Sequence, residues 1–128
     1  MSLALPRTAP GKALLAVRLV FGAAWLAPVT ALRILGLKPD ENREAAYVGR
    51  LFAARDAALG IGLMASRGGS RKLWWRIGIG CDVADALAGL VSARRGELPN
   101  NRRLRVSLFV AGIVGAALGA TALAKDDV

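Results

Sequence analysis

Charged side chains interrupt two of the most apolar stretches of this sequence. Arg55 and Asp56 begin the run RDAALGIG, and Asp82 and Asp85 lie within GCDVADALAGL. An ionisable group in a membrane-spanning helix is rare, faces inward, and is usually paired or functional. These four side chains therefore constrain how the apolar segments pack, and they predict that the segments meet one another.

The composition favours helices over strands. The chain has 128 residues, which is one domain (1–128), and 55% of them are hydrophobic while only 5% are aromatic. Its apolar content is mostly Ala, Leu, Val and Gly, and no stretch alternates with the period of two that strands require. The sequence therefore predicts an all-α protein.

Four apolar segments are each about 20 residues long, the length that crosses a bilayer. They cover residues 13–32, 45–66, 73–92 and 106–124. We expect a four-transmembrane-helix bundle with short connections, a multi-pass protein of a bacterial cytoplasmic membrane. Pro28 either kinks the first span or ends it, in which case the residues from Val29 to Leu37 form a short interfacial helix.

The net charge of +9 comes from 18 basic and 9 acidic residues. Most basic residues lie in the connections, where they would meet anionic lipid headgroups. No nucleic-acid recognition motif accompanies them, so we expect the partners to be the lipid bilayer and a membrane protein or a second copy of the chain. The basic residues divide evenly between the two faces, so the orientation stays open.

Histidine is absent and Cys81 is the only cysteine. The usual general base and the commonest metal ligand are therefore missing. Cys81 is expected to act as a small buried hydrophobe. No catalytic residue, cofactor-binding residue or metal site is predicted, and the chain is expected not to be an enzyme.

The charged residues predict one polar cluster. If the turn RGGSRK forms an antiparallel hairpin, Arg55 lies level with Asp82 and Asp85, which are three residues apart and share a helix face. Arg18 reaches the level of Asp56. This charge cluster of Arg18, Arg55, Asp56, Asp82 and Asp85 has two interpretations: ion pairs that fix helix register, or a site where a leftover carboxylate binds a proton, cation or polar substrate.

Small residues recur along the last apolar segment. Gly112, Gly115 and Gly119 lie three and four residues apart, so they share a helix face. Small residues at this spacing let helix backbones approach closely, and we expect them to serve helix packing.

The stretches RLFAARDAALGIGL and GCDVADALAGLVSARRG resemble a family of small bacterial and fungal membrane proteins known as a domain of unknown function. The resemblance covers about residues 13–123. It implies a four-helix membrane protein without an established activity. The residues that carry it are Pro28, Gly36, Leu37, Arg55, Asp56, Gly60 and Asp82 or Asp85.

These observations favour a non-enzymatic structural or accessory membrane component with a buried Arg/Asp cluster. One alternative is a small proton- or cation-coupled transporter that uses the intramembrane aspartates. A third is a membrane enzyme that acts on a lipid with an aspartate as acid or base.

Overall fold

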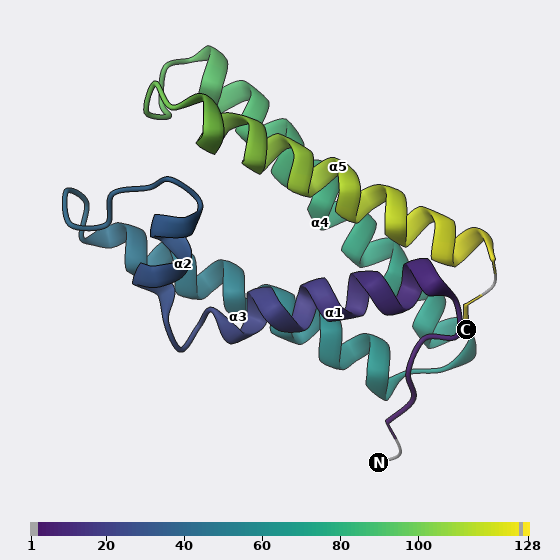
Figure 1. Cartoon of the computed structure of the whole chain (residues 1–128). Helices are drawn as coiled ribbons and strands as arrows, with labels where there is room; N and C mark the ends of the chain where they lie inside the picture. The colour runs from purple at the N-terminus through teal and green to yellow at the C-terminus, as the bar shows by residue number, and fades with distance from the viewer. Residues whose placement is uncertain (1–2, 126) are drawn as a thin grey trace.

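The computed structural model describes residues 3–125 and 127–128 of the chain (Figure 1). The described residues form helices and connections, without strands. The helices are α1 (Ala9–Ala23), α2 (Pro28–Ile34), α3 (Glu44–Ala65), α4 (Gly68–Arg94) and α5 (Arg102–Ala124). The prediction of an all-α chain is therefore right.

The prediction of a four-transmembrane-helix bundle is wrong. Among the described residues, only α5 is both long enough and apolar enough to cross a membrane. The multi-pass localisation in a bacterial cytoplasmic membrane and the description as a multi-span integral membrane protein lose their support with it.

Length and charge explain why the other three predicted spans are not helices that could cross a membrane. Helix α1 has 15 residues, or about 22 Å, against a hydrocarbon core of about 30 Å. Helix α3 carries Arg50, Arg55 and Asp56 within its length. Helix α4 contains its two aspartates and several basic residues, which lower its mean hydropathy.

The first predicted span is two helices. Helix α1 ends at Ala23, a turn follows, and Pro28 opens α2 at the position where its missing N–H costs nothing. Helix α2 closes on Gly36, whose φ of 89° suits glycine, and the N–H of Leu37 donates to the carbonyl of Leu32 at 2.9 Å. The alternative with a helix break near Pro28 is the correct one.

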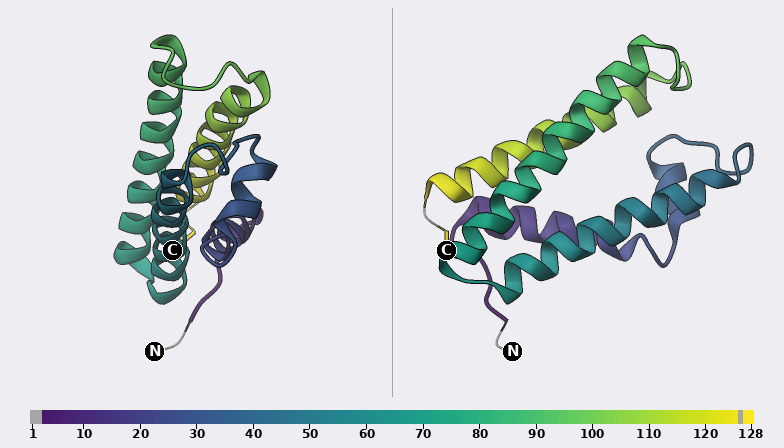
Figure 2. Two further views of the ribbon diagram at one scale, coloured as in Figure 1. Left: turned by 90° about the vertical axis from the view of Figure 1, so that its left-hand side faces the viewer. Right: turned by 180° about the vertical axis from the view of Figure 1, so that it is seen from behind.

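The helices form two arms (Figures 1 and 2). Helices α4 and α5 pack along each other as one arm, and α1 and α2 pack on α3 as the other. Helix α1 also contacts α5, whereas α3 and α4 contact each other sparsely. The arms therefore meet mainly where α1 lies against the C-terminal half of α5.

The apolar core lies near the chain termini. Leu14, Leu63, Trp75 and Ala122 form it, one residue from each long helix and from α1, and each is at most 2% exposed. At the opposite end of the arms, the side-chain amide of Asn101 donates to the carbonyl of Gly36 at 2.9 Å. The arms are thus joined by apolar packing at one end and by a hydrogen bond at the other.

A polar clasp ties the C-terminal tail to the start of α1. The Asp127 carboxylate accepts hydrogen bonds from the backbone N–H of Arg7 at 2.8 Å, and from the backbone N–H and hydroxyl of Thr8 at 2.9 and 2.6 Å. The indole N–H of Trp75 donates to the Asp127 carbonyl at 2.7 Å. Asp127 is 1% exposed, so these bonds are shielded from water.

Arg71 continues the clasp on the other side of the tail. Its guanidinium donates to the carbonyls of Ala4 at 2.7 Å and Ser66 at 3.0 Å, and Arg71 is 1% exposed. Burial alone would raise the pKa of Asp127, but the hydrogen bonds from Thr8 and Arg7 and the charge of Arg71 outweigh it and lower that pKa. The clasp is therefore built for a charged carboxylate.

We expect Asp127→Asn to lower the free energy of unfolding at neutral pH by about 1.5–3 kcal/mol, the usual worth of hydrogen bonds to a charged group. A carboxyl whose pKa falls on folding stabilises the fold above its unfolded pKa and stops doing so as pH falls through the folded value. The difference from the wild type should therefore shrink below pH 3.8, the ordinary value. Chemical denaturation from pH 7 to pH 3 measures it, and a constant difference would contradict a charge-dependent clasp.

Candidate functional site

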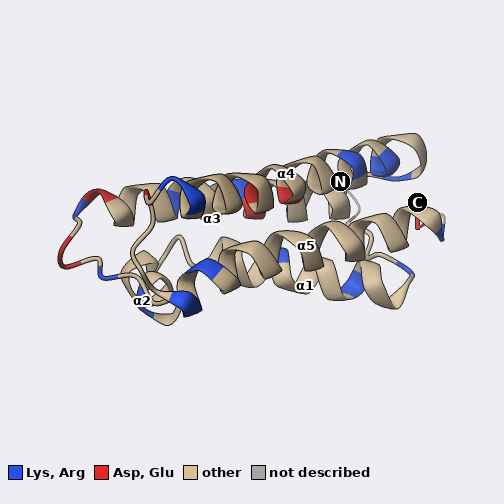
Figure 3. Cartoon of the chain, turned by 90° about the horizontal axis from the view of Figure 1, so that it is seen from above, with Lys and Arg blue, Asp and Glu red and all other residues tan. Residues whose placement is uncertain are grey.

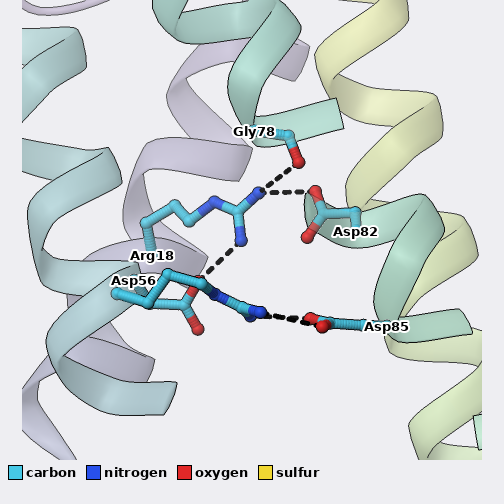
Figure 4. Close-up of polar contacts among 6 residues, drawn as sticks. Arg18, Asp56, Gly78, Asp82 and Asp85 are labelled. Carbon is cyan, nitrogen blue, oxygen red and sulfur yellow. Dashed lines mark hydrogen bonds and ion pairs between the residues drawn. The ribbon is translucent and has the colours of Figure 1, made fainter. Parts of the chain in front are cut away.

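Arg18 is the centre of the charge cluster (Figure 4). It projects from α1 between α3 and α4 and is 4% exposed. Its guanidinium donates to Asp56 on α3 at 2.7 Å and to Asp82 on α4 at 2.5 Å, with a longer contact of 3.4 Å to the carbonyl of Gly78. One cation thus connects three helices from both arms.

Arg55 makes the second bridge between the arms. It holds Asp85 with two parallel hydrogen bonds of 2.8 and 2.6 Å, the bidentate geometry that suits guanidinium and carboxylate. Asp56 is 3.8 Å away, and the guanidinium lies 5.0 Å from the centre of the Phe52 ring. About a third of each side chain of this pair is exposed, so water screens it more than it screens the Arg18 contacts.

All five residues singled out in the sequence lie together, but one pairing differs from the prediction. Arg55 binds Asp85 and not Asp82, because Asp82 points toward α1 and binds Arg18. The prediction places residues of α3 and α4 at the same level as if these two helices formed an isolated hairpin. It leaves out α1, whose long arginine side chain reaches both of them.

The cluster holds two guanidiniums and three carboxylates, so its formal charge is −1 with every group ionised. Burial raises the pKa of Asp82, against the opposing hydrogen bond and charge of Arg18. Burial and the nearby charge of Asp56 both disfavour the ionised form of Asp82, and the contacts with Arg18 favour it.

The glycines of α5 bring its backbone against the cluster. A Cβ at Gly112 would lie 2.6 Å from the Asp82 carbonyl oxygen, and one at Gly115 would lie 2.6 Å from the Asp82 carboxylate. At Gly119 it would lie 2.9 Å from Ile79. Helices α4 and α5 approach closely because these positions lack side chains, and this approach covers Asp82 from one side.

The chemistry available to the cluster is limited. Each of its three carboxylates is in an ion pair with an arginine. Within residues 3–125 and 127–128, no group of three or more acidic or cysteine side chains is arranged to hold a metal ion. Cys81 is a free, half-buried cysteine next to Asp82 in sequence, and its charged neighbour Arg55 is already bound to Asp85. The geometry fits a structural network better than a reaction centre.

Sequence reasoning missed the clasp of Asp127 and Arg71. Both are buried and charged, as the cluster residues are. Asp127 lies in a polar tail and Arg71 in a basic turn, where charge is ordinary. Their contacts join segments up to 120 residues apart, and no local pattern signals such a meeting.

No protein-family model matches the chain, and no curated protein and no solved structure is significantly similar to it. The resemblance to the domain of unknown function therefore stays a prediction.

We expect Arg18→Met to cost about 3–5 kcal/mol of unfolding free energy, because it leaves the buried Asp82 without its arginine and leaves Asp56 only the 3.8 Å contact with Arg55. Arg55→Met is the matched control. It should cost about 1 kcal/mol or less, since its pair is partly solvated. Adding Asp56→Asn and Asp82→Asn to Arg18→Met should recover part of the loss. Equal costs for the two arginines in chemical denaturation would contradict the central position of Arg18.

Gly115→Ala should destabilise the protein by about 1–3 kcal/mol, because the added methyl must displace the Asp82 carboxylate. Gly80→Ala provides the control, since a Cβ there meets no atom within 4 Å. Removing glycine from this exposed helical position should stabilise the fold by about 0.5–1 kcal/mol. Opposite shifts in melting temperature are expected. An unchanged melting temperature for Gly115→Ala would show that the α4–α5 contact accommodates the added methyl group at little cost.

Proposed function

We propose that this protein is a structural or accessory component that associates with a lipid bilayer, and that α5 is the helix that enters the hydrocarbon. The observation that carries the proposal is the distribution of side chains, with charge inside and large apolar groups outside. The internal charge serves the fold, and the apolar exterior supplies the contact with lipid.

The interior is unusually polar for a chain of this composition. Arg18, Asp56, Arg71, Asp82 and Asp127 are each at most 8% exposed. Meanwhile large apolar side chains on α1, α3, α4 and α5 lie open, among them Val20 at 70% and Leu87 at 57%. A protein that stays in water rarely leaves large contiguous apolar patches uncovered. Exposed large apolar side chains occur on α1 and on every long helix, and this distribution favours an apolar medium over a single protein partner.

Helix α5 shows the pattern most clearly. Its glycine face packs on α4, while its other face exposes Val106, Val110, Ile113 and Val114, each between 47% and 50% exposed. Its 23 residues span about 34 Å, enough for a hydrocarbon core of about 30 Å.

Two ordinary reasons for a long apolar helix do not fit α5. The core helix of a globular protein is mostly buried, but only 22% of the most apolar part of α5 is covered. A secretory signal lies near an N-terminus, whereas α5 begins at Arg102. Contact between the outer face of α5 and lipid therefore explains the helix best.

Vesicle flotation tests the proposal. The wild type should float with neutral phosphatidylcholine vesicles, where electrostatic attraction contributes little. Val110→Asp/Ile113→Asp places two charges on the outer face of α5 at about 2.5–3.5 kcal/mol each. We expect it to reduce vesicle partitioning by at least about a hundredfold while retaining its helical circular dichroism.

Asn42→Asp/Ser70→Asp is the matched control, because both positions are exposed and polar and the change in net charge is the same. It should float like the wild type. A wild type that stays in the aqueous fraction as a folded monomer would refute the association with lipid.

A further inference from the structure

The connection between α4 and α5 carries four exposed arginines, only one of which makes an ion pair among the described residues. Arg94 and Arg95 end α4, and Arg102 and Arg103 begin α5; all four are exposed, and we call them the arginine tip. Arg95 lies 4.0 Å from Glu97. Across the described residues, the other three arginines of the tip make no ion pair.

The backbone under the arginine tip is firmly built. Gly96, with φ of 71°, ends α4, and the side chain of Asn101 caps α5 by accepting from the N–H of Leu104 at 3.3 Å. Arg105 donates to the carbonyls of Leu98 at 3.1 Å and Pro99 at 3.1 Å, and these hydrogen bonds tie the loop to the first turns of α5. The tip arginines thus project from a fixed turn.

The α2–α3 connection is a useful contrast. It also holds basic residues, but there Arg33 pairs with Asp40 at 3.0 Å and Lys38 pairs with Glu41 at 3.0 Å. Its charge is neutralised within the connection. The arginine tip instead concentrates positive charge at the start of α5, where the first turn of the helix adds its own positive potential. Figure 3 shows that the basic residues of α5 are confined to its beginning.

The tip directly adjoins the apolar outer face of α5, which starts at Val106. A bilayer offers the matching sequence of surfaces, because a layer of phosphate groups lies next to the acyl chains. We propose that the arginine tip binds the phosphates of anionic lipids and determines which end of α5 lies at the headgroups. This inference rests on the proposed function and deepens it by naming the lipid class and the contact residues.

A nucleic acid would also attract arginines, but it leaves the adjoining valines and Phe109 without a partner. Phe109 is 42% exposed and belongs to the same end of α5. Only a partner that combines anionic groups with an apolar interior satisfies both surfaces. The observations therefore favour anionic lipid over a polyanion in water.

The test compares flotation with phosphatidylcholine vesicles that contain or lack phosphatidylglycerol. The wild type should bind the anionic vesicles more tightly, and added salt should narrow the difference. Arg102→Gln/Arg103→Gln should lose roughly 30-fold in affinity for anionic vesicles, at about 1 kcal/mol per arginine near the surface. It should keep the wild-type affinity for neutral vesicles.

Arg33→Gln/Lys38→Gln removes the same charge from the neutralised connection and should lose little. Equal binding of the wild type to both vesicle types, or equal losses in the two variants, would overturn the arginine tip as a lipid site and leave the proposed function standing. Failure to bind neutral vesicles at all would instead remove the proposed function. Tighter binding of a DNA duplex than of anionic vesicles through Arg102 and Arg103 would overturn the assignment to lipid.

Discussion

The placement of Arg18 is the constraint on which the rest of this structure depends. Two buried carboxylates from different arms need a cation between them, and only a long side chain on α1 supplies it. This requirement fixes the depth of α1 relative to α3 and α4. It also requires α5 to approach closely enough to cover Asp82, which explains the glycines of α5. The close packing of α5 and the pairing of the buried charges therefore depend on each other.

The apolar cluster of Leu14, Leu63, Trp75 and Ala122 connects the arms at one end only. Its members are concentrated near the termini. Farther along the arms, the connections are polar: the charge cluster in the middle and the bond from Asn101 to Gly36 at the far end. Polar contacts of this kind are directional, so they specify one arrangement of the arms. The apolar side chains that do not enter the core remain exposed.

Much of this arrangement could be predicted from the sequence, for definable reasons. Helical composition and the membership of the charge cluster follow from local pattern and from the cost of burying charge, whereas at Pro28 the sequence left a kink and a break both open. The partner of Asp82 could not be predicted, because it depends on the packing of a third helix. The multi-pass topology was wrong because average apolarity concealed the short length of α1 and the many charges of α3 and α4.

The clasp at Asp127 has a consequence for how the chain reaches its final state. Thr8 caps the start of α1, yet its contact with Asp127 spans 119 residues. Contacts of such long sequence separation form slowly, because a large loop must close first. Helices α4 and α5 follow each other in the chain and can pair early. The first turn of α1 gains its contacts with Asp127 only when the C-terminal tail has docked. During synthesis, the segment around Thr8 is made early but can form its contacts with Asp127 only after residue 127 has been added.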